Sequence, residues 1–300
     1  MPEQVRWGML GAAHIAERAL LPAFASSRNG TLVAVASRDS ERAKAMLVSY
    51  PEVRIHTSYD ALLADPEVDA VYNPLPNSHH KEWSIRALEA GKHVLCEKPI
   101  ALDAGEADEM AAAAAAAKRH LMEAFMYRFH PSLREFVETA RDALHVSAQF
   151  GFMAHDANDI RLQASLGGGA LLDVGCYTVS VTRWILGEPI DVVAAANVRD
   201  GVDLTTSALL TFPGGRTASL WSSIESARIE DVTVIKPGRV LRRSPAFSAR
   251  EDHDPYQLML DSFGESVLSA RPLEIPMSES IANMRVLDAI RETSRSRSAS

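Results

Sequence analysis

The sequence has few cysteines and no long apolar run. Cys96 and Cys176 are the only cysteines among 300 residues. Two cysteines cannot form a disulfide framework, and neither has a metal-ligand spacing, so we expect a reducing, cytoplasmic location. Residues 1–6 lack the basic and apolar regions of a signal peptide, and no apolar stretch is long enough to span a bilayer. These absences argue against a secreted disulfide scaffold and against a membrane protein.

Positive charge is also in short supply. The chain carries 31 Lys and Arg against 39 Asp and Glu, a formal net charge of −8. An acidic balance disfavours non-specific binding of nucleic acid and of anionic membrane surfaces. Any anionic ligand must therefore be held by a local cationic pocket, and we expect a small molecule as the partner. A length of 300 residues exceeds that of a single core, which predicts two domains.

The first 124 residues alternate apolar, strand-like segments with helical ones. Strands are expected at residues 5–10, 31–37, 70–75, 93–97 and 121–124. Helices are expected at residues 14–27, 38–50 and 79–90 and across the alanine run 111–117. Such alternation predicts an α/β fold with a parallel, doubly wound sheet of the Rossmann type. We therefore assign residues 1–124 to a dinucleotide-binding Rossmann domain.

Beyond residue 124 the pattern changes. A half-exposed strand is expected at residues 145–153, and several strands joined by turn signals at 191–243. Helices are expected at residues 167–187, 255–270 and 278–294, and the last residues, 295–300, as a frayed tail. Strands in succession with helices at the ends predict an α+β domain with a mostly antiparallel sheet. We assign residues 125–300 to this domain and expect it to bind the substrate.

A glycine-containing turn follows the first strand. Gly11, Ala13 and Ala16 occupy the spacing of the dinucleotide fingerprint G-x-G-x-x-G/A, with alanine in place of the second glycine. In that fingerprint the turn and the first helical residues lie against the pyrophosphate. We therefore expect Gly11, Ala13, His14 and Ile15 to bind the cofactor, with a plain strand–helix turn as the alternative.

The end of the second strand favours NADP over NAD. An acidic side chain at this point binds the ribose 2′-hydroxyl in NAD enzymes, whereas here the strand ends at Ser37 and Arg38. A small hydroxyl and a planar guanidinium suit a 2′-phosphate, and Arg42 lies one helical turn further on. Asp39 is the competing signal, because its carboxylate could turn inward to the ribose instead.

A lysine follows the strand expected at residues 93–97. In a doubly wound sheet the carboxyl ends of the strands face the ligand crevice, and the proline after Lys98 bends the chain there. Asp173 and Tyr177 are four residues apart and share one face of a helix. The glycines at residues 167–169 permit close packing against another domain. Taken alone, these side chains could also be a surface lysine, a first-turn aspartate and a core tyrosine.

These segments together resemble the glucose–fructose oxidoreductase / inositol dehydrogenase family, often written Gfo/Idh/MocA. The resemblance spans nearly the whole chain and is carried by residues 8–16, 72–101, 123–131, 167–177 and 283–290. The Glu-Lys-Pro segment at 97–99 is its most specific part. The segment EAFMYRFHP at 123–131 is most similar to a branch of NADP-dependent aldose dehydrogenases, dihydrodiol dehydrogenases and nucleotide-sugar ketoreductases.

The resemblance implies roles for individual residues. Lys98 is implied as the catalytic lysine, Tyr177 as the proton donor or acceptor, and Asp173 as the residue that orients the substrate. A cationic lysine lets a phenol, whose pKa is normally about 10, act near neutrality. The other implied contacts are Pro74, Leu75, Asn77, His80, Glu97, Lys98 and Arg128 with the cofactor, and Tyr127 and Arg161 with the substrate. No metal is implied.

The resemblance also implies a function. The implied function is that of an NADP-dependent oxidoreductase acting on a sugar or polyol, with the C1 hydroxyl of an aldose as the favoured reacting group. Reduction of a keto-sugar or nucleotide sugar, and oxidation of a trans-dihydrodiol, are alternatives at the same site. A non-catalytic dinucleotide sensor is a further alternative, although such proteins tend to lack Lys98 or Tyr177. We expect a homo-oligomer, a dimer or a tetramer, whose form is left open because residues 221–256 are shorter than is typical of the family.

Overall fold

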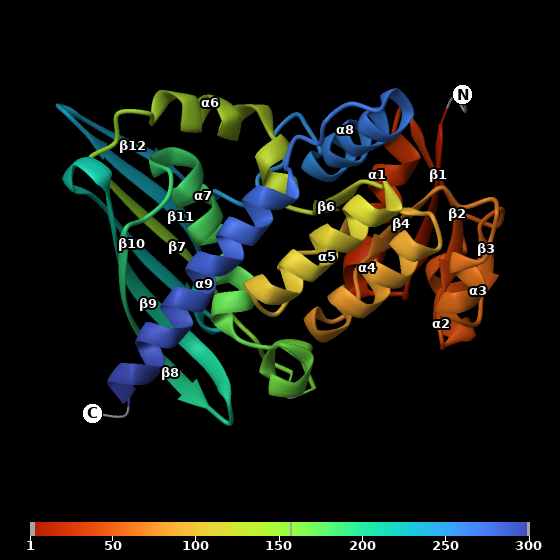
Figure 1. The fold of residues 1–300 in the computed structure, drawn as a ribbon, viewed down its shortest axis with the longest axis horizontal. Helices are drawn as coiled ribbons and strands as arrows, with labels where there is room; N and C mark the ends of the chain where they lie inside the picture. Colours follow the sequence, from red (N-terminus) through yellow and green to blue (C-terminus); the bar gives the residue numbers. More distant parts are fainter. Residues whose placement is uncertain (1–3, 157, 299–300) are drawn as a thin grey trace. The chain divides into compact units, whose positions relative to one another are not determined.

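The computed structural model describes residues 4–156 and 158–298, which divide into two compact units (Figure 1). The first unit contains the described residues up to Ala101, together with Gly105–Phe129 and Asp252–Ser280. The second contains Leu102–Ala104, His130–Glu251 and the described residues from Ile281 onward. Among the helices of these residues, none is long and apolar enough to cross a membrane.

The first unit is built on a six-stranded parallel sheet, as the alternation of strands and helices predicts. The spatial order of the strands is β3-β2-β1-β4-β5-β6. They are β1 (Val5–Leu10), β2 (Gly30–Ala36), β3 (Arg54–His56), β4 (Ala70–Asn73), β5 (His93–Cys96) and β6 (Leu121–Glu123). The strand order reverses between β1 and β4, and in such sheets ligands bind at the carboxyl ends of the strands beside that point.

The helices of this unit largely follow the expected ranges. They are α1 (Leu21–Ser26), preceded by a π-helical turn at Ala16–Leu20, α2 (Ser40–Met46), α4 (His80–Glu89) and α5 (Ala104–Ala117). The alanine run is helical, as expected, and Ala107, Met110 and Ala114 are its buried positions. Their spacing of three and four residues gives α5 one apolar stripe toward the core.

Two short elements of this unit lie outside the expected set. The strand β3 has only three residues, two of them polar, which is too short for an apolar period to be recognised. The helix α3 (Tyr59–Leu63) begins after Ser58, whose side chain accepts a hydrogen bond from the backbone of Ala61. This N-cap is the local signal that marks the helix.

The helix α8 (Pro255–Ser269) belongs to the first unit although it lies late in the chain. The buried carboxylate of Asp261 accepts hydrogen bonds from Ser27 Oγ at 2.7 Å and from Arg28 Nε at 2.8 Å. The ring of Phe263 lies 5.3 Å from that of Trp7 in β1, centroid to centroid. These contacts bring α8, a segment distant in the chain, back to the first unit.

The second unit contains a six-stranded, mostly antiparallel sheet, as expected. Its order is β12-β11-β7-β10-β9-β8, and only β7 and β10 pair in parallel. The strands are β7 (His145–Met153), β8 (Asp191–Arg199), β9 (Val202–Phe212), β10 (Arg216–Ser223), β11 (Glu225–Lys236) and β12 (Arg239–Arg243). The turn signals at 199–201, 213–215 and 236–238 fall between β8 and β9, β9 and β10, and β11 and β12.

The helices outside this sheet differ from the expected ranges in three places. The glycines at 167–169 precede the helix, which begins as a π-helical turn at Leu171–Gly175 and continues as α7 (Cys176–Leu186). The helix α6 (Pro131–Thr139) was not expected. The helix α9 (Met277–Ser298) is longer than expected, so the frayed tail is wrong for residues 295–298, whereas 299–300 lie outside the described residues. Arginine favours helix, and neither glycine nor proline interrupts this segment.

Candidate active site

The turn after β1 has the geometry that the dinucleotide fingerprint requires. Gly11 has φ +83°, and its backbone N–H donates to the carbonyl of Ala36 at the end of β2. A Cβ at Gly11 would lie 3.2 Å from the side chain of Leu75, so both the dihedral angle and the space favour glycine. Ala13 and Ile15 are half-buried and His14 is exposed at the start of the helix that follows. The turn can therefore present backbone N–H groups to an anion.

Two arginines after the end of β2 are exposed, and the aspartate between them caps the next helix. Ser37 is buried, and its hydroxyl donates to the carbonyl of Asp39 at 2.8 Å. The Asp39 carboxylate caps α2 by accepting the backbone N–H of Arg42 at 3.0 Å. Within the described residues the guanidinium groups of Arg38 and Arg42 have no ion-pair partner. The tip is therefore a cationic surface, with its one carboxylate used in a helix cap.

A buried asparagine ties the end of β4 to helix α4. Asn73 is fully buried, and its Nδ2 donates to Ser84 Oγ at 3.1 Å. Pro74 and Leu75 are buried, whereas Asn77 is half-buried at the start of a 3₁₀ turn. Of the cofactor residues expected in this segment, only Asn77 thus keeps a partly accessible side chain.

His80 supports the turn that carries Lys98. Its ring is fully buried, with Nδ1 2.8 Å from the carbonyl oxygen of Pro99 and Nε2 2.8 Å from that of Leu75. Burial lowers the pKa of His80 to about 4, so at neutral pH the ring carries one N–H and donates to one of these carbonyls at a time. Both ring nitrogens face protein atoms.

Lys98 directly follows β5, and buried groups hold its backbone. The Glu97 carboxylate accepts the hydroxyl of Tyr72 and, at 3.2 Å, the backbone N–H of Lys98. Behind the cis peptide bond between Lys98 and Pro99, the backbone N–H of Ile100 donates to Glu123 Oε1 at 2.9 Å. The Lys98 side chain itself is half-buried. A rigid turn thus presents one lysine at the carboxyl edge of the sheet.

The segment after β6 contributes Tyr127 and Arg128. Tyr127 is buried, with 2% exposure, and its ring packs edge-on against Phe125. Arg128 Nη1 lies 3.7 Å from Glu279 Oε2. Tyr127 is thus a core residue of the first unit, and the Arg128 guanidinium lies beside Glu279.

In the second unit, Arg161 and Asp173 form an ion pair. Arg161 Nε donates to Asp173 Oδ2 at 2.7 Å, and Nη1 lies 3.2 Å from Asp159 Oδ1. The charge of Asp173 raises the pKa of Arg161, so this guanidinium stays charged. Arg161 and Asp173, each expected at the substrate, thus lie within hydrogen-bond distance of each other.

Tyr177 lies in an aromatic cluster of the second unit. Its ring centroid is 5.4 Å from those of Phe150 on β7 and Phe247 beyond β12. The two phenylalanine rings stack at 5.2 Å with an interplanar angle of 8°. Tyr177 is 7% exposed. Apolar rings thus fix its orientation and surround it with a medium of low polarity.

The glycines before α7 serve packing inside the second unit. A Cβ at Gly168 would lie 2.4 Å from the carbonyl oxygen of Arg161, and one at Gly169 would lie 2.1 Å from Asp203 Oδ1. Both contacts are impossible for a side chain. The glycines therefore allow the backbone at Arg161 and strand β9 to approach closely. The close packing expected against another domain is thus found within the second unit.

Four residues of these clusters escaped sequence reasoning, namely Tyr72, Glu123, Phe150 and Phe247. The phenylalanines have no local signal, because aromatic residues on strands are ordinary core residues. Glu123, in contrast, has a local sequence signal. It interrupts the apolar run Leu-Met-Glu-Ala-Phe-Met at 121–126, where a charged side chain on a buried strand needs a partner or a function.

Comparison with known proteins gives consistent matches over both units. Residues 5–125 match an oxidoreductase family with an NAD-binding Rossmann fold, and residues 142–235 match the Gfo/Idh/MocA C-terminal domain. The chain is 36% identical over 320 residues to D-xylose 1-dehydrogenase (NADP(+)) 2 of Haloferax volcanii, with 98% of each sequence covered.

Solved structures show the same likeness. One is the aldose-aldose oxidoreductase of Caulobacter crescentus complexed with glycerol, with a TM-score of 0.91, 28% identity and 98% of each chain covered. Another is KijD10, a 3-ketoreductase of Actinomadura kijaniata in complex with NADP and TDP-benzene. Its TM-score is 0.87 at 31% identity, with 97% of this chain and 98% of that chain covered.

Proposed function

Because the chain belongs to the Gfo/Idh/MocA oxidoreductase family, we propose that it is an NADP-dependent dehydrogenase of sugars or polyols. The favoured reaction is oxidation at the C1 hydroxyl of an aldose. Relatives named for xylose oxidation, aldose oxidoreduction and sugar ketoreduction support this class of substrate. The observation that carries the proposal is the rigid turn that presents Lys98 at the carboxyl edge of a Rossmann sheet.

The tip of β2 supports NADP as the cofactor. Arg38 and Arg42 are exposed and suit a phosphate, whereas the Asp39 carboxylate is engaged at the N-terminus of α2. The turn with Gly11, Ala13, His14 and Ile15 would hold the pyrophosphate at a helix N-terminus. When bound, NADP supplies hydride transfer, and the protein supplies orientation and proton management.

We propose Lys98 and Tyr177 as the two catalytic side chains. The Lys98 ammonium is a donor suited to polarise the oxygen of the reacting carbon. The Tyr177 hydroxyl would accept the alcohol proton during oxidation and return it during reduction. The Asp173–Arg161 pair presents donors and acceptors to sugar hydroxyls. Residues 1–124 would thus bind mainly the cofactor, and 125–300 mainly the substrate.

We further propose that the protein is a homo-oligomer, a dimer or a tetramer. Five apolar side chains on the strands of the second sheet are 43–54% exposed: Met153, Val198, Leu209, Ile235 and Val240. Such residues on neighbouring strands suit a contact with a second copy. Light scattering coupled to size exclusion tests this, and a monomer at micromolar concentration would contradict it.

The function is tested by following the absorbance of reduced cofactor. The purified protein is incubated with NADP⁺ or NAD⁺ and a panel of aldoses and cyclic trans-diols, and NADPH is run in parallel with keto-sugars. Turnover with NADP⁺ and an aldose is the expected result. Turnover confined to keto-sugars would favour the ketoreductase that the likeness to KijD10 suggests. NADPH binding without turnover of any substrate would favour a dinucleotide sensor.

A further inference from the structure

The carboxyl group of Glu123 is fully buried and only half satisfied. This side chain ends β6, has 0% exposure and accepts the Ile100 N–H through Oε1. Its second oxygen, Oε2, makes no hydrogen bond within the described residues, and neither does the buried hydroxyl of Ser280. Orphaned polar atoms are rare in protein interiors, so this one needs an explanation.

The charges around Glu123 point to Lys98. In register on β5, Cys96 lies opposite Glu123, and the chain then enters the Lys98 turn. Burial opposes the charged form of Glu123, whereas the proximity of the Ser280 hydroxyl, the hydrogen bond from the Ile100 N–H and the charges of Arg128 and Lys98 favour it. The net result of burial against these groups is a pKa of Glu123 of about 7. Within the described residues no cation forms an ion pair with it.

We propose that Glu123 is a positioning residue for Lys98, whose ionised carboxylate anchors the Lys98–Ile100 turn and balances the charge of the lysine. The inference rests on the proposed catalytic role of Lys98. A charge-assisted hydrogen bond from the Ile100 N–H to a carboxylate is stronger than one to a neutral acid. Loss of the charge loosens this anchor and removes a negative group facing Lys98. The ionised form is therefore the competent one.

The consequence is a pH dependence that belongs to Glu123. Its carboxyl takes up a proton near neutrality, and its hydrogen bond with the Ile100 N–H then weakens, while His80 and Glu97 continue to hold the turn. Activity should fall to a lower plateau on the acidic side and not to zero, because Lys98 itself remains. A purely structural carboxylate would change stability without such a step in the pH profile.

The matched test is Glu123→Gln. The amide keeps the shape, can still accept the Ile100 N–H, and can donate to the Ser280 hydroxyl, but it never ionises. Across a range from one unit below to two units above the pKa, kcat/KM of the wild-type protein should rise about tenfold. The Glu123→Gln protein should stay on the lower plateau throughout, with unchanged affinity for NADPH. An unchanged pH profile in this variant overturns the proposal.

Two controls distinguish a positioning effect of Glu123→Gln from a loss of folding. Asp65→Asn alters another buried carboxylate of the same unit and should leave the shape of the profile as in the wild type. Infrared difference spectra of the wild-type protein above and below the pKa should show one carboxylic-acid carbonyl band that Glu123→Gln removes. If the wild-type protein shows no carboxylic acid titrating near neutrality, the proposal fails whether or not the variant folds.

The same readouts distinguish this proposal from the proposed function. A titrating band from Glu123 together with no turnover of any sugar would sink the sugar-dehydrogenase assignment and not the protonation of the carboxyl group. Turnover with a Glu123→Gln profile identical to the wild type would sink the positioning role alone.

Discussion

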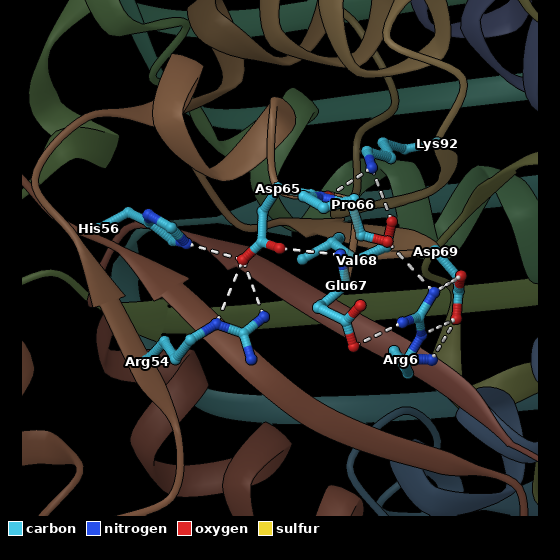
Figure 2. A network of polar contacts seen from close by, with 9 residues as sticks. All are labelled: Arg6, Arg54, His56, Asp65, Pro66, Glu67, Val68, Asp69 and Lys92. Atoms are coloured by element: carbon cyan, nitrogen blue, oxygen red, sulfur yellow. Dashed lines mark hydrogen bonds and ion pairs between the residues drawn. The ribbon is translucent and has the colours of Figure 1, made fainter.

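The two ends of strand β5 each have a lysine, and their surroundings are opposite. Lys92, just before the strand, is 8% exposed, and its Nζ donates to the carbonyl oxygens of Asp65 and Val68, both at 2.7 Å (Figure 2). Lys98, just after the strand, is half-buried, and the buried hydrogen bonds there hold its backbone. The fold uses the Lys92 ammonium as a hydrogen-bond donor inside the first unit, whereas at Lys98 these buried hydrogen bonds hold the backbone.

The carboxyl groups near the two lysines also differ in how many hydrogen-bond and ion-pair partners they have. Around Lys92, Asp65 accepts hydrogen bonds from Arg54 at 2.8 Å and from His56 at 3.0 Å, and Arg6 pairs with Asp69 (Figure 2). Burial raises the pKa of Asp65, but these hydrogen bonds outweigh it and lower the value to about 2. Near Lys98, burial dominates and raises the pKa of Glu123 to about 7. Full pairing indicates a structural role, and an unpaired buried acid indicates a functional one.

The largest expected effect separates the two lysines by activity. Lys98→Ala should lower kcat roughly a hundred- to ten-thousand-fold, because the donor to the reacting oxygen is lost. The melting temperature and the affinity for NADPH should change little. Steady-state kinetics and thermal denaturation measure both quantities.

Lys92→Met is the matched control at the other end of the strand. It removes the side-chain donor from two buried carbonyl oxygens, although that of Asp65 still accepts the backbone N–H of Val68 at 3.2 Å. The loss should lower the free energy of unfolding by about 1–3 kcal/mol. The kcat of the folded fraction should stay at the wild-type value. If Lys92→Met lowers kcat as strongly as Lys98→Ala, the contrast between the ends of β5 is wrong.

The two carboxyl groups should respond to neutralisation with opposite signs. The folded-state pKa of Glu123 lies above the ordinary glutamate value of 4.5, so its burial costs stability as pH rises from about 4.5 to 7. At pH values above 7, Glu123→Gln should therefore raise the free energy of unfolding by on the order of 3 kcal/mol, and near pH 5 by much less. Denaturant titrations at both pH values measure the difference.

Asp65→Asn should lower the free energy of unfolding, the opposite of the change expected for Glu123→Gln. The folded-state pKa of Asp65 is below the ordinary aspartate value of 3.8, so its stabilising effect is complete above about pH 4 and is lost as pH falls toward 2. The variant should lose on the order of 2 kcal/mol at neutral pH and match the wild type near pH 2. If both substitutions change the free energy of unfolding at neutral pH in the same direction, the contrast between the surroundings of Glu123 and Asp65 is wrong.

The smallest effect concerns two arginines of the first unit, Arg38 after the end of β2 and Arg54 on β3. Arg38→Ala should weaken NADPH binding about tenfold and leave NADH binding unchanged, because only the 2′-phosphate contact is lost. Arg54→Ala, which removes a partner of Asp65, should leave both affinities unchanged and lower stability by about 1 kcal/mol. Fluorescence titration with each cofactor measures the affinities. Equal losses for NADPH and NADH in Arg38→Ala would argue against the NADP assignment.

Much of this could be predicted from local sequence. The parallel sheet, the antiparallel sheet and the helical alanine run follow from apolar periods and propensities that act over a few residues. The short elements β3 and α3 escaped because three to five residues hold no full period. The helix α8 could be predicted as a helix but not as part of the first unit, because its contacts reach back to Trp7 and Ser27.

The sequence by itself determined the fold class, the glycine turn at Gly11, the cationic tip at Arg38 and the lysine at the end of β5. These are local choices of backbone conformation, periodicity and charge. Only the tertiary structure decided which acids are paired and which are not. Arg54 meets Asp65, and Ile100 meets Glu123, across 11 and 23 residues of chain. Burial and charge act through space, so the pKa of a carboxyl group is a property of the packed molecule and not of its segment.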